Sequence, residues 1–393
     1  MATLTDHPVG EPISFALSPE QELLRQEVRR FGEQRLRPGL AERDAQRELA
    51  LDLVRELGAM GLLGCFVPER WGGAGLDQVS YVVAVEELAR VDPAIAVTVS
   101  VSNSVCCWPI LAFARDELKE RALRELASGE ALGGFGLTEP GSGSDVASLK
   151  TTARRDGEDW VLDGEKAWIT NAGFARWYVV VARTLPEGGS RGLSAFAVPA
   201  DAPGFAVGTP EHKLGLRSSR TAPIYFNGCR IPAGNLLGEE GQGFKIAMAT
   251  LDHSRLGIAA QAVGIHQRSL ELAVDYARDR RQFGAPLAEH QAIQMKIAQM
   301  ATELAAAREL TRAAAAIADA GGHDAGRFAS QAKLYASEAA NRACWESLQV
   351  HGGNGFSDEY EISKLYRDVR VTAIYEGTSE MQRLVIARRL LRG

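Results

Sequence analysis

Cysteine is scarce in this sequence and never occurs in a metal-binding or disulfide-type spacing. The 393 residues include five cysteines, and no two of them form a C-x-x-C pair. This usage argues against a disulfide framework and against a zinc site, and it favours reduced thiols in a cytoplasmic protein. The five residues are Cys65, Cys106, Cys107, Cys229 and Cys344.

Excess positive charge and targeting signals are also lacking. The formal net charge is −6, which gives no reason to expect nucleic-acid or membrane-surface binding. Met1 to Phe15 contain Asp6 and Glu11 and no apolar core, so no signal peptide is expected. We further expect no membrane span, because no uncharged apolar run is expected to reach the required length.

Several enzyme signatures are missing. There is no phosphate-binding loop that ends in Gly-Lys-Ser/Thr, no dinucleotide fingerprint G-x-G-x-x-G and no H-E-x-x-H zinc motif. The glycine-rich stretch from Phe135 to Asp145 contains no lysine and leads into no long helix. The sequence therefore predicts neither a Rossmann fold nor a metal centre.

The residue pattern changes twice along the chain. Helical patterns continue to about residue 130, β-branched and aromatic runs with glycine and proline follow to about 240, and long alanine-rich helical patterns come after Gly243. This predicts an α+β multidomain protein. The expected segments are a flexible extension (1–14), an N-terminal α-helical domain (15–132), a β domain (133–243) and a C-terminal α-helical domain (244–393).

Individual elements can be placed within these segments. Ser18-Pro19-Glu20-Gln21 predicts a capped helix start, and Asp163-Gly164 predicts a hairpin turn after a strand. Gly352-Gly353 predicts a helix end. Further strands are expected at 178–182, 193–198 and 223–226, and long helices at 244–278, 287–320 and 325–350.

The stretch from Ala373 to Glu380 combines an acid with a helix start. Glu376 precedes Gly377, Thr378 is a suitable N-cap, and the following residues have the spacing of an amphipathic helix. A helix N-terminus suits a phosphate group. Taken alone, this acid is most simply a turn residue, and the stretches around Thr138, Trp168, Arg280 and His351 likewise have plain structural readings.

Together these stretches resemble the acyl-CoA dehydrogenases over about 18–391. The matching motifs are Gly136-Leu137-Thr138-Glu139-Pro140-Gly141-Ser142-Gly143-Ser144-Asp145, Trp168-Ile169-Thr170-Asn171, Lys213-Leu214-Gly215, Arg280-x-x-Phe283-Gly284, Gln349-x-x-Gly352-Gly353-x-Gly355-Phe356 and Ile374-Tyr375-Glu376-Gly377-Thr378. The resemblance implies a helical domain, a β domain and a C-terminal four-helix domain that hold FAD, usually in a homotetramer. It also implies an electron-transfer flavoprotein as the acceptor.

The resemblance assigns roles to individual residues. Glu376 is expected to be the base that removes the α proton of an acyl-CoA, with a raised pKa, while a hydride passes from the β carbon to flavin N5. The cofactor contacts carried over are Phe135, Leu137, Thr138, Ser144, Trp168, Ile169, Thr170, Arg280, Gln282, Phe283, Gln291, Gln349, Gly352, Gly353, Thr378, Ser379 and Glu380, several of them reaching the flavin of a neighbouring subunit. The substrate contacts are Ser144, Asp252, Arg255, Gln261, Thr372, Glu376 and Gly377.

The resemblance also bears on which substrate is used. Some relatives place the base just before the arginine that is Arg255 here, but this position holds Ser254, so Glu376 has no rival. Residues 93–114 carry no charge and Ala96 stands where glutaryl-CoA relatives have arginine, which argues against a dicarboxylate. Gln261 and Thr372 match positions that shorten the cavity in butyryl-CoA relatives, whereas Trp108 is larger than usual in that branch.

A short or short-branched acyl-CoA is therefore expected, and alternatives remain. A carrier-protein-bound acyl thioester would require nearly the same residues. An acyl-CoA oxidase would pass electrons to O₂, although such relatives are usually longer. A non-enzymatic helical scaffold would leave Glu376 and the flavin motifs unexplained.

Overall fold

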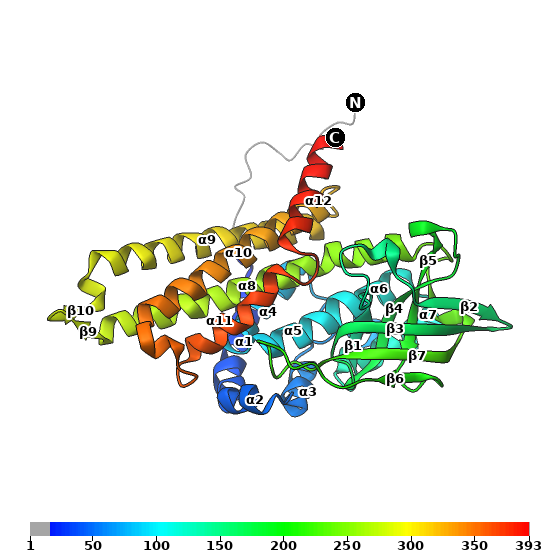
Figure 1. Ribbon diagram of the computed structural model, residues 1–393, viewed down its shortest axis with the longest axis horizontal. Coiled ribbons are helices and arrows are strands. Elements are labelled where there is room, and N and C mark those ends of the chain that lie inside the picture. The colour runs from blue at the N-terminus through cyan, green and yellow to red at the C-terminus, as the bar shows by residue number, and fades with distance from the viewer. Residues whose placement is uncertain (1–15, 393) are drawn as a thin grey trace.

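The computed structural model describes residues 16–392, so the predicted extension at 1–14 lies outside the described residues. Figure 1 shows an elongated molecule with a helical bundle at one end and a β-sheet at the other. Shorter N-terminal helices pack against both parts. The helical, β and helical order predicted from the sequence is confirmed.

The first helix begins where its sequence predicts. In α1 (Pro19–Phe31) the Ser18 hydroxyl accepts from the Gln21 amide at 3.2 Å, and the Gln21 side chain accepts from the Ser18 amide at 3.0 Å. This reciprocal pair is a capping box. The other N-terminal α-helices are α2 (Leu40–Gln46), α3 (Leu51–Ala59), α4 (Gln78–Val91), α5 (Pro93–Val101), α6 (Trp108–Phe113) and α7 (Asp116–Ser128).

One helical run corrects the expectation about apolar length. The π-helical turn η3 (Ser102–Cys107) joins α5 to α6, so Pro93–Phe113 forms a helix of 21 residues that is long and apolar enough to cross a membrane by length and composition alone. The expectation that no uncharged run reaches this length was wrong. However, 89% of the 18-residue apolar window within this helix is buried inside the protein, as in the core helix of a globular domain.

The middle of the chain forms an eight-stranded sheet with the order β6-β7-β3-β2-β4-β5-β8, and β1 pairs in parallel with β4. The longest strands, β3 and β7, run antiparallel. The strands are β1 (Leu132–Gly136), β2 (Thr152–Asp156), β3 (Asp159–Thr170), β4 (Ala175–Arg183), β5 (Leu193–Pro199), β6 (Phe205–Val207), β7 (Thr221–Pro232) and β8 (Leu236–Leu237).

The hairpin turn predicted at Asp163-Gly164 is wrong. The β2–β3 turn lies earlier, where Asp156 pairs with Asp159, and β3 continues through Gly164 with a shift of register against β7. Gly164 has φ +138°, and a Cβ there would lie 2.8 Å from the Thr151 Cα. Gly164 therefore permits a bulge and a close backbone contact within a strand, and it does not form a turn.

Three long helices form most of the C-terminal bundle: α8 (Gly243–Asp279), α9 (Gln291–Asp319) and α10 (Ala325–His351). Their predicted ranges are confirmed, except that 287–289 form a 3₁₀ turn before α9. The start of α8 reaches the sheet, because a Cβ on Gly243 would lie 2.5 Å from the Ser194 backbone in β5. The remaining elements are β9 (Arg281–Gln282), β10 (Ala285–Pro286), α11 (Glu361–Val369) and α12 (Ser379–Arg392).

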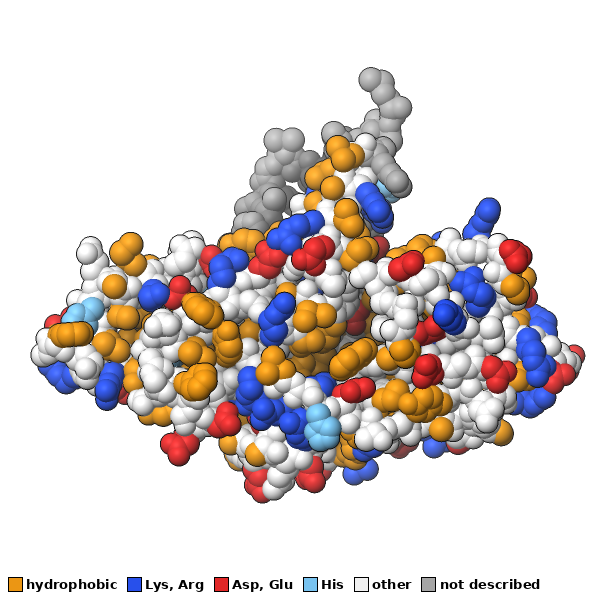
Figure 2. Space-filling model, viewed as in Figure 1, with side chains coloured by type: hydrophobic (Ala, Val, Ile, Leu, Met, Phe, Trp, Pro, Cys, Tyr) orange, Lys and Arg blue, Asp and Glu red, His pale blue; other side chains and the backbone are white. Residues whose placement is uncertain are grey.

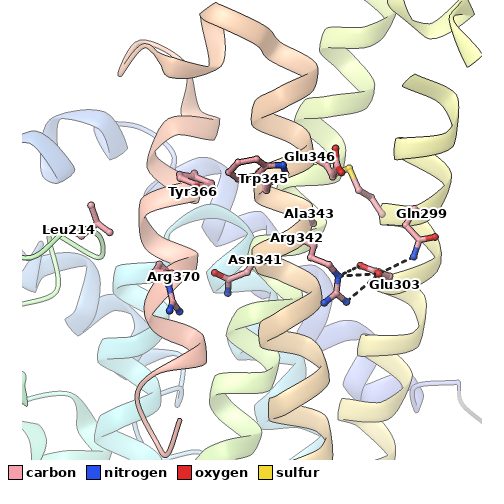
Figure 3. A pocket seen from close by; sticks show the side chains of 11 residues that line it. Leu214, Gln299, Glu303, Asn341, Arg342, Ala343, Trp345, Glu346, Tyr366 and Arg370 are labelled. Atoms are coloured by element: carbon pink, nitrogen blue, oxygen red, sulfur yellow. Dashed lines mark hydrogen bonds and ion pairs between the residues drawn. The ribbon is translucent and has the colours of Figure 1, made fainter. Parts of the chain in front are cut away.

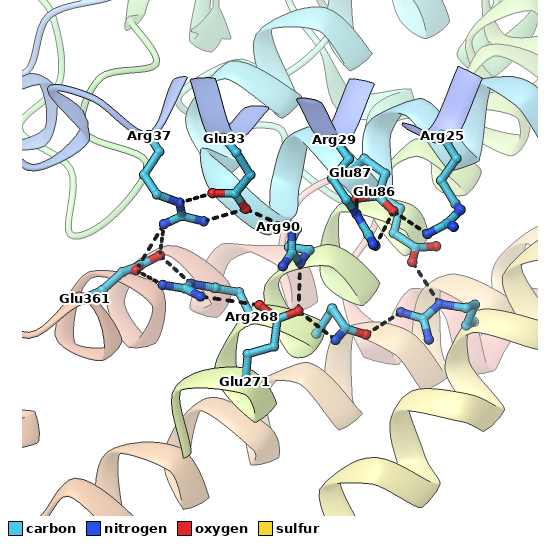
Figure 4. A network of polar contacts seen from close by, with 12 residues as sticks. Arg25, Arg29, Glu33, Arg37, Glu86, Glu87, Arg90, Arg268, Glu271 and Glu361 are labelled. Carbon is cyan, nitrogen blue, oxygen red and sulfur yellow. Dashed lines mark hydrogen bonds and ion pairs between the residues drawn. The ribbon is translucent and has the colours of Figure 1, made fainter. Parts of the chain in front are cut away.

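Six side chains form a closed ring of alternating charge that joins the N-terminal helices to the C-terminal bundle (Figure 4). Arg90 Nε donates to Glu271 at 2.7 Å, and Arg268 Nη2 donates to Glu361 at 2.6 Å. All six side chains are largely shielded from solvent. In order around the ring they are Glu33, Arg90, Glu271, Arg268, Glu361 and Arg37.

Replacing Arg268 by Met should lower the free energy of unfolding by about 2 kcal/mol, because two shielded carboxylates lose a partner. Arg30→Met is the matched control: its pair with Glu27 is exposed, so about 0.5 kcal/mol or less is expected. Urea titration of both variants measures the difference. Equal losses would contradict a special contribution from the ring.

The effect of Arg268→Met should also depend on pH. The Arg37 hydrogen bond lowers the pKa of Glu33; burial raises that of Glu271, but the Arg90 hydrogen bond and charge outweigh this effect. The charge of Arg268 helps to lower the pKa of both carboxyls, and the substitution removes this contribution. A carboxyl whose pKa is lower in the folded state stabilises it above the unfolded pKa, and this contribution is lost as pH falls through the folded value. The gap between parent and variant should therefore shrink below about pH 4.

Candidate active site

Glu376 lies in a strained loop between α11 and α12. Its φ is +54° and that of Gly377 is +89°, a left-handed conformation that glycine adopts freely but glutamate does not. Gln382 holds this conformation, because its Nε2 donates to the carbonyl oxygens of Glu376 at 3.1 Å and Gly377 at 2.8 Å. Thr378 Oγ1 accepts from the Met381 amide at 3.4 Å, which confirms the predicted N-cap.

The Glu376 carboxylate is backed by α8. Ser254 Oγ donates to Glu376 Oε2 at 2.6 Å. Burial raises the pKa of Glu376 above its ordinary value, and the Ser254 hydrogen bond and the charges of Arg255 and Lys333 only partly oppose this effect. The predicted direction of the pKa is confirmed. A carboxylate with a raised pKa and one oxygen left for another partner is suited to accept a proton.

An apolar cluster adjoins the Glu376 loop through Tyr375, the residue that precedes Glu376. Phe135, Val371 and Tyr375 pack against a cluster of buried residues that comes mainly from α5 and η3. The Tyr375 hydroxyl donates to Gln261 Oε1, and Gln261 Nε2 donates to the Pro93 carbonyl at 2.8 Å, so the Gln261 amide is held on two sides. The buried members of the cluster are Ala94, Val97, Val101, Val105 and Leu216.

The two residues expected to shorten the cavity are placed differently. Gln261 contacts the Glu376 loop through Tyr375, whereas Thr372 donates to the Val369 carbonyl at 2.7 Å and accepts from Asn341 of α10 at 3.4 Å. Both are fully buried. Trp108 stacks on the ring of His253, the neighbour of Ser254, with ring centroids 4.7 Å apart.

Two of the predicted substrate contacts lie together on α8. Arg255 is buried, donates to Asp252, and also donates to Ser330 of α10 at 3.1 Å. Ser144 is exposed in the loop that follows β1.

A second group of predicted residues gathers on the sheet. The Thr138 carbonyl accepts from the Ala167 amide at 2.9 Å, which places the loop after β1 beside Trp168. Trp168 is 60% exposed with φ +62°. Ile169 points into the core, so only its backbone is available on this surface, while Phe135 and Thr170 are partly exposed and Leu137 is buried.

A buried ion pair fixes the loop after β1, which sequence reasoning missed. Lys166 Nζ donates to Glu139 Oε1 at 2.8 Å, and Glu139 also accepts from the amides of Lys150 and Thr151. Gly141 and Gly143 have open space where a Cβ would stand. An exposed aromatic ring beside an open glycine loop fits the face of a planar flavin.

The third group lies at the far end of the bundle. Arg280, Gln282, Phe283 and Gln291 surround β9 and β10, which lie at the opposite end of the molecule from the sheet (Figure 1). Phe283 is 96% exposed. The α10 end with Gln349, Gly352 and Gly353 belongs to the same region, because Asn354 donates to the Tyr276 hydroxyl of α8 at 2.9 Å. Within one chain, therefore, these residues do not meet the sheet group.

Thr378, Ser379 and Glu380 line a hollow of about 390 Å³ with Arg370 and Arg342. These two arginines also line a neighbouring cavity of about 640 Å³ (Figure 3), whose wall includes the exposed side chains Trp345 and Leu214. Figure 2 shows apolar side chains over the bundle and around the hollowed centre of this face. Glu376 lines neither hollow.

Sequence reasoning missed the side chains that hold the Glu376 loop. Ser254 was noted only as a position without a glutamate, and Lys333, whose Nζ donates to the Gly377 carbonyl at 2.8 Å, was not singled out. A signal existed for Lys333: it interrupts the buried alanine face of α10, where Ala329, Ala332 and Ala336 have helical spacing. Among residues 16–392 no cluster of potential metal ligands occurs.

Three family profiles match the chain. They are the N-terminal domain (residues 18–130), the middle domain (residues 134–229) and the C-terminal domain (residues 241–391) of acyl-CoA dehydrogenase. The chain is 46% identical to an acyl-CoA dehydrogenase of Bacillus subtilis over 96% of its own length and 99% of the relative's. It is 47% identical to the mitochondrial short-chain specific acyl-CoA dehydrogenase of Rattus norvegicus, over 96% and 92%.

Solved structures agree with this result. Butyryl-CoA dehydrogenase from Megasphaera elsdenii has 41% identity and a TM-score of 0.95, over 97% of this chain and 100% of that one. A prolyl acyl carrier protein oxidase, AnaB, is also similar, with 33% identity and a TM-score of 0.92 over 95% and 100%. The chain therefore belongs to the acyl-CoA dehydrogenase family of flavin-dependent oxidoreductases.

Proposed function

We propose that this acyl-CoA dehydrogenase oxidises a short or short-branched acyl-CoA to the trans-2-enoyl-CoA with FAD as its cofactor, and that Glu376 is the base. The proposal rests on the buried Glu376 carboxylate, which has a raised pKa and receives one hydrogen bond from Ser254. Tyr375, the residue before it, packs on an uncharged apolar cluster. Such a carboxylate is a general base for a weakly acidic carbon.

The reaction removes a proton from the α carbon and a hydride from the β carbon, which leaves a C=C double bond. Glu376 takes the proton on a carboxylate oxygen, and its own backbone N–H is assigned to the thioester carbonyl, where it stabilises the negative charge that develops on the oxygen. Bound flavin supplies the hydride acceptor. The left-handed backbone at Glu376 fixes the side chain and the amide of the same residue for these two tasks.

The cofactor is assigned to residues from two chains. The sheet group (Phe135, Leu137, Thr138, Trp168, Ile169 and Thr170, with Ser144 from the same loop as Thr138) would hold the ring system. The adenosine diphosphate part would be held by the residues at the far end of the bundle (Arg280, Gln282, Phe283, Gln291, Gln349, Gly352 and Gly353) and by Thr378, Ser379 and Glu380, several of which would reach the FAD of a neighbouring subunit. The separation of these groups within one chain supports this arrangement, and the exposed Phe283 and Trp345 support burial by another subunit. We accordingly propose a homotetramer that passes its electrons to an electron-transfer flavoprotein.

A second candidate is the same oxidation of an acyl group on a carrier protein, or with O₂ as the acceptor. The similarity to a prolyl acyl carrier protein oxidase favours keeping it. Oxygen consumption separates oxidase from dehydrogenase, and a paired assay with one acyl group on CoA and on a carrier protein separates the two thioesters. We place acyl-CoA first because the higher-identity relatives act on it by name.

Glu376→Gln should keep the fold and the bound FAD and should slow flavin reduction by about 10²–10⁴, because the amide has nearly the same shape but cannot accept the proton. Anaerobic stopped-flow bleaching of the flavin by butyryl-CoA measures this rate. Ser254→Ala is the matched comparison: it removes only the hydrogen bond and should cost far less. Near-parental reduction by Glu376→Gln would refute the assignment.

Arg280→Ala should weaken FAD retention and lower the melting temperature, because a charge-assisted contact to the pyrophosphate is lost and the bound cofactor stabilises the native state. Added FAD should restore both. Arg278→Ala, an exposed arginine at the end of the same helix, is the control. An unchanged ratio of flavin to protein after dialysis of the Arg280 variant would count against the proposed contact.

Chains of four to six carbons should be preferred over chains of twelve or more. Gln261→Ala should shift this preference upward, because the amide between Pro93 and Tyr375 would be replaced by space in which each further methylene gains about 0.8 kcal/mol. Thr372→Ala alone should have a smaller effect, since its hydroxyl faces Val369 and Asn341. The comparison is kcat/KM for butyryl-CoA against dodecanoyl-CoA; a parental preference for the longer substrate would reject the idea.

A further inference from the structure

A buried lysine lies directly behind the Glu376 loop. Lys333 of α10 is fully buried, and its Nζ donates to the Gly377 carbonyl at 2.8 Å. Its neighbours on the buried face of α10 are small residues: Ala329, Ser330, Ala336 and Ser337. An apolar side chain would fill such a place without the free energy needed to remove a charge from water, so packing alone does not account for a lysine here.

The hydrogen bond to Gly377 does not neutralise the ammonium. Within residues 16–392 no carboxylate lies within 4 Å of Lys333 Nζ. Burial lowers the pKa of Lys333 to about 8; the carboxylate that most favours its charged form is Glu376, and Arg255 opposes it. A buried cation without an adjacent anion acts over a longer distance on other charged groups, and the interaction of Lys333 with Glu376 is the strongest of these.

The second cation near Glu376 is already engaged. Arg255 also lowers the pKa of Glu376, and more strongly than Lys333 does, but it is paired with Asp252 and donates to Ser330. Lys333 has no such carboxylate partner within the described residues, so its charge acts on Glu376 without an adjacent anion to oppose it. The titratable and charged groups that face this pair are Arg255 and Asp252 of α8, Glu338 of α10, Glu380 and Arg389 of α12, Tyr81 of α4 and Tyr375 of the loop itself.

We propose that Lys333 is a positioning residue for the base: it fixes the Gly377 peptide, and its positive charge keeps the Glu376 carboxyl ionised before substrate binds. The inference rests on the proposed role of Glu376. Without the cation the carboxyl holds its proton to a higher pH, so activity is lost first on the acidic side.

Two substitutions separate the charge from the hydrogen bond. Lys333→Gln keeps a donor for the Gly377 carbonyl and removes the charge, whereas Lys333→Met removes both. Both should move the acidic limb of kcat/KM against pH upward by about one pH unit. Lys333→Met should in addition lower kcat at the new optimum, because the Gly377 peptide is released.

Lys364→Met is the control for removing a buried lysine from the bundle. Lys364 pairs with Asp368 and has no hydrogen bond to the Glu376 loop within the described chain. It should lower the melting temperature and leave the acidic limb where the parent has it. An acidic limb of kcat/KM that lies at the parental pH in both Lys333 variants would overturn the proposal. If Lys333→Gln keeps the parental acidic limb of kcat/KM and only Lys333→Met loses activity, the proposed effect of the lysine charge on Glu376 is overturned.

A readout that does not depend on turnover keeps this inference separate from the proposed function. Infrared difference spectra between each protein and its Glu376→Gln counterpart report the protonated carboxyl of Glu376 as pH is varied. The titration should move upward in both Lys333 variants, and an unmoved titration would overturn the proposal. If the parent turns over no acyl thioester, the proposed function fails while this titration still decides the role of Lys333.

Discussion

The close packing of α10 on α8 is the constraint on which the site depends. The loop that carries Glu376 belongs to neither helix, yet its contacts come from both: Ser254 of α8 bonds the carboxylate, and Lys333 of α10 bonds the next peptide. Small buried residues such as Ala259 and Ala336 allow the two helices to approach. A loss of this packing would release the Glu376 loop from both helices at once.

Much of this architecture follows from local sequence. The capping box at Ser18, the long alanine-rich helices and the acid before the α12 cap are signals within a few residues, and the structure contains each of them. Fold class and the position of Glu376 were therefore predictable. The family resemblance supplied the roles of the remaining site residues, and those roles stay predictions.

What the sequence did not predict depends on contacts between distant segments. Asp163-Gly164 has turn composition, but the approach of Thr151 makes it a bulge inside a strand. The run Pro93–Phe113 has the length of a membrane span, and only its packing inside the protein identifies it as a core helix. Lys333 and Glu376 are 43 residues apart, so no local pattern connects them.

The charge ring has a consequence for the order in which the protein is made. Arg37 and Glu33 are synthesised early, but Glu361 is residue 361 of 393, and Arg268 and Glu271 also come long after the first helices. During translation Arg37 and Arg90 therefore face water without their C-terminal partners, Glu361 and Glu271, until the segments that carry these two residues have been synthesised. The final docking of the N-terminal helices belongs to the last stage of biosynthesis, after the sheet has had time to form.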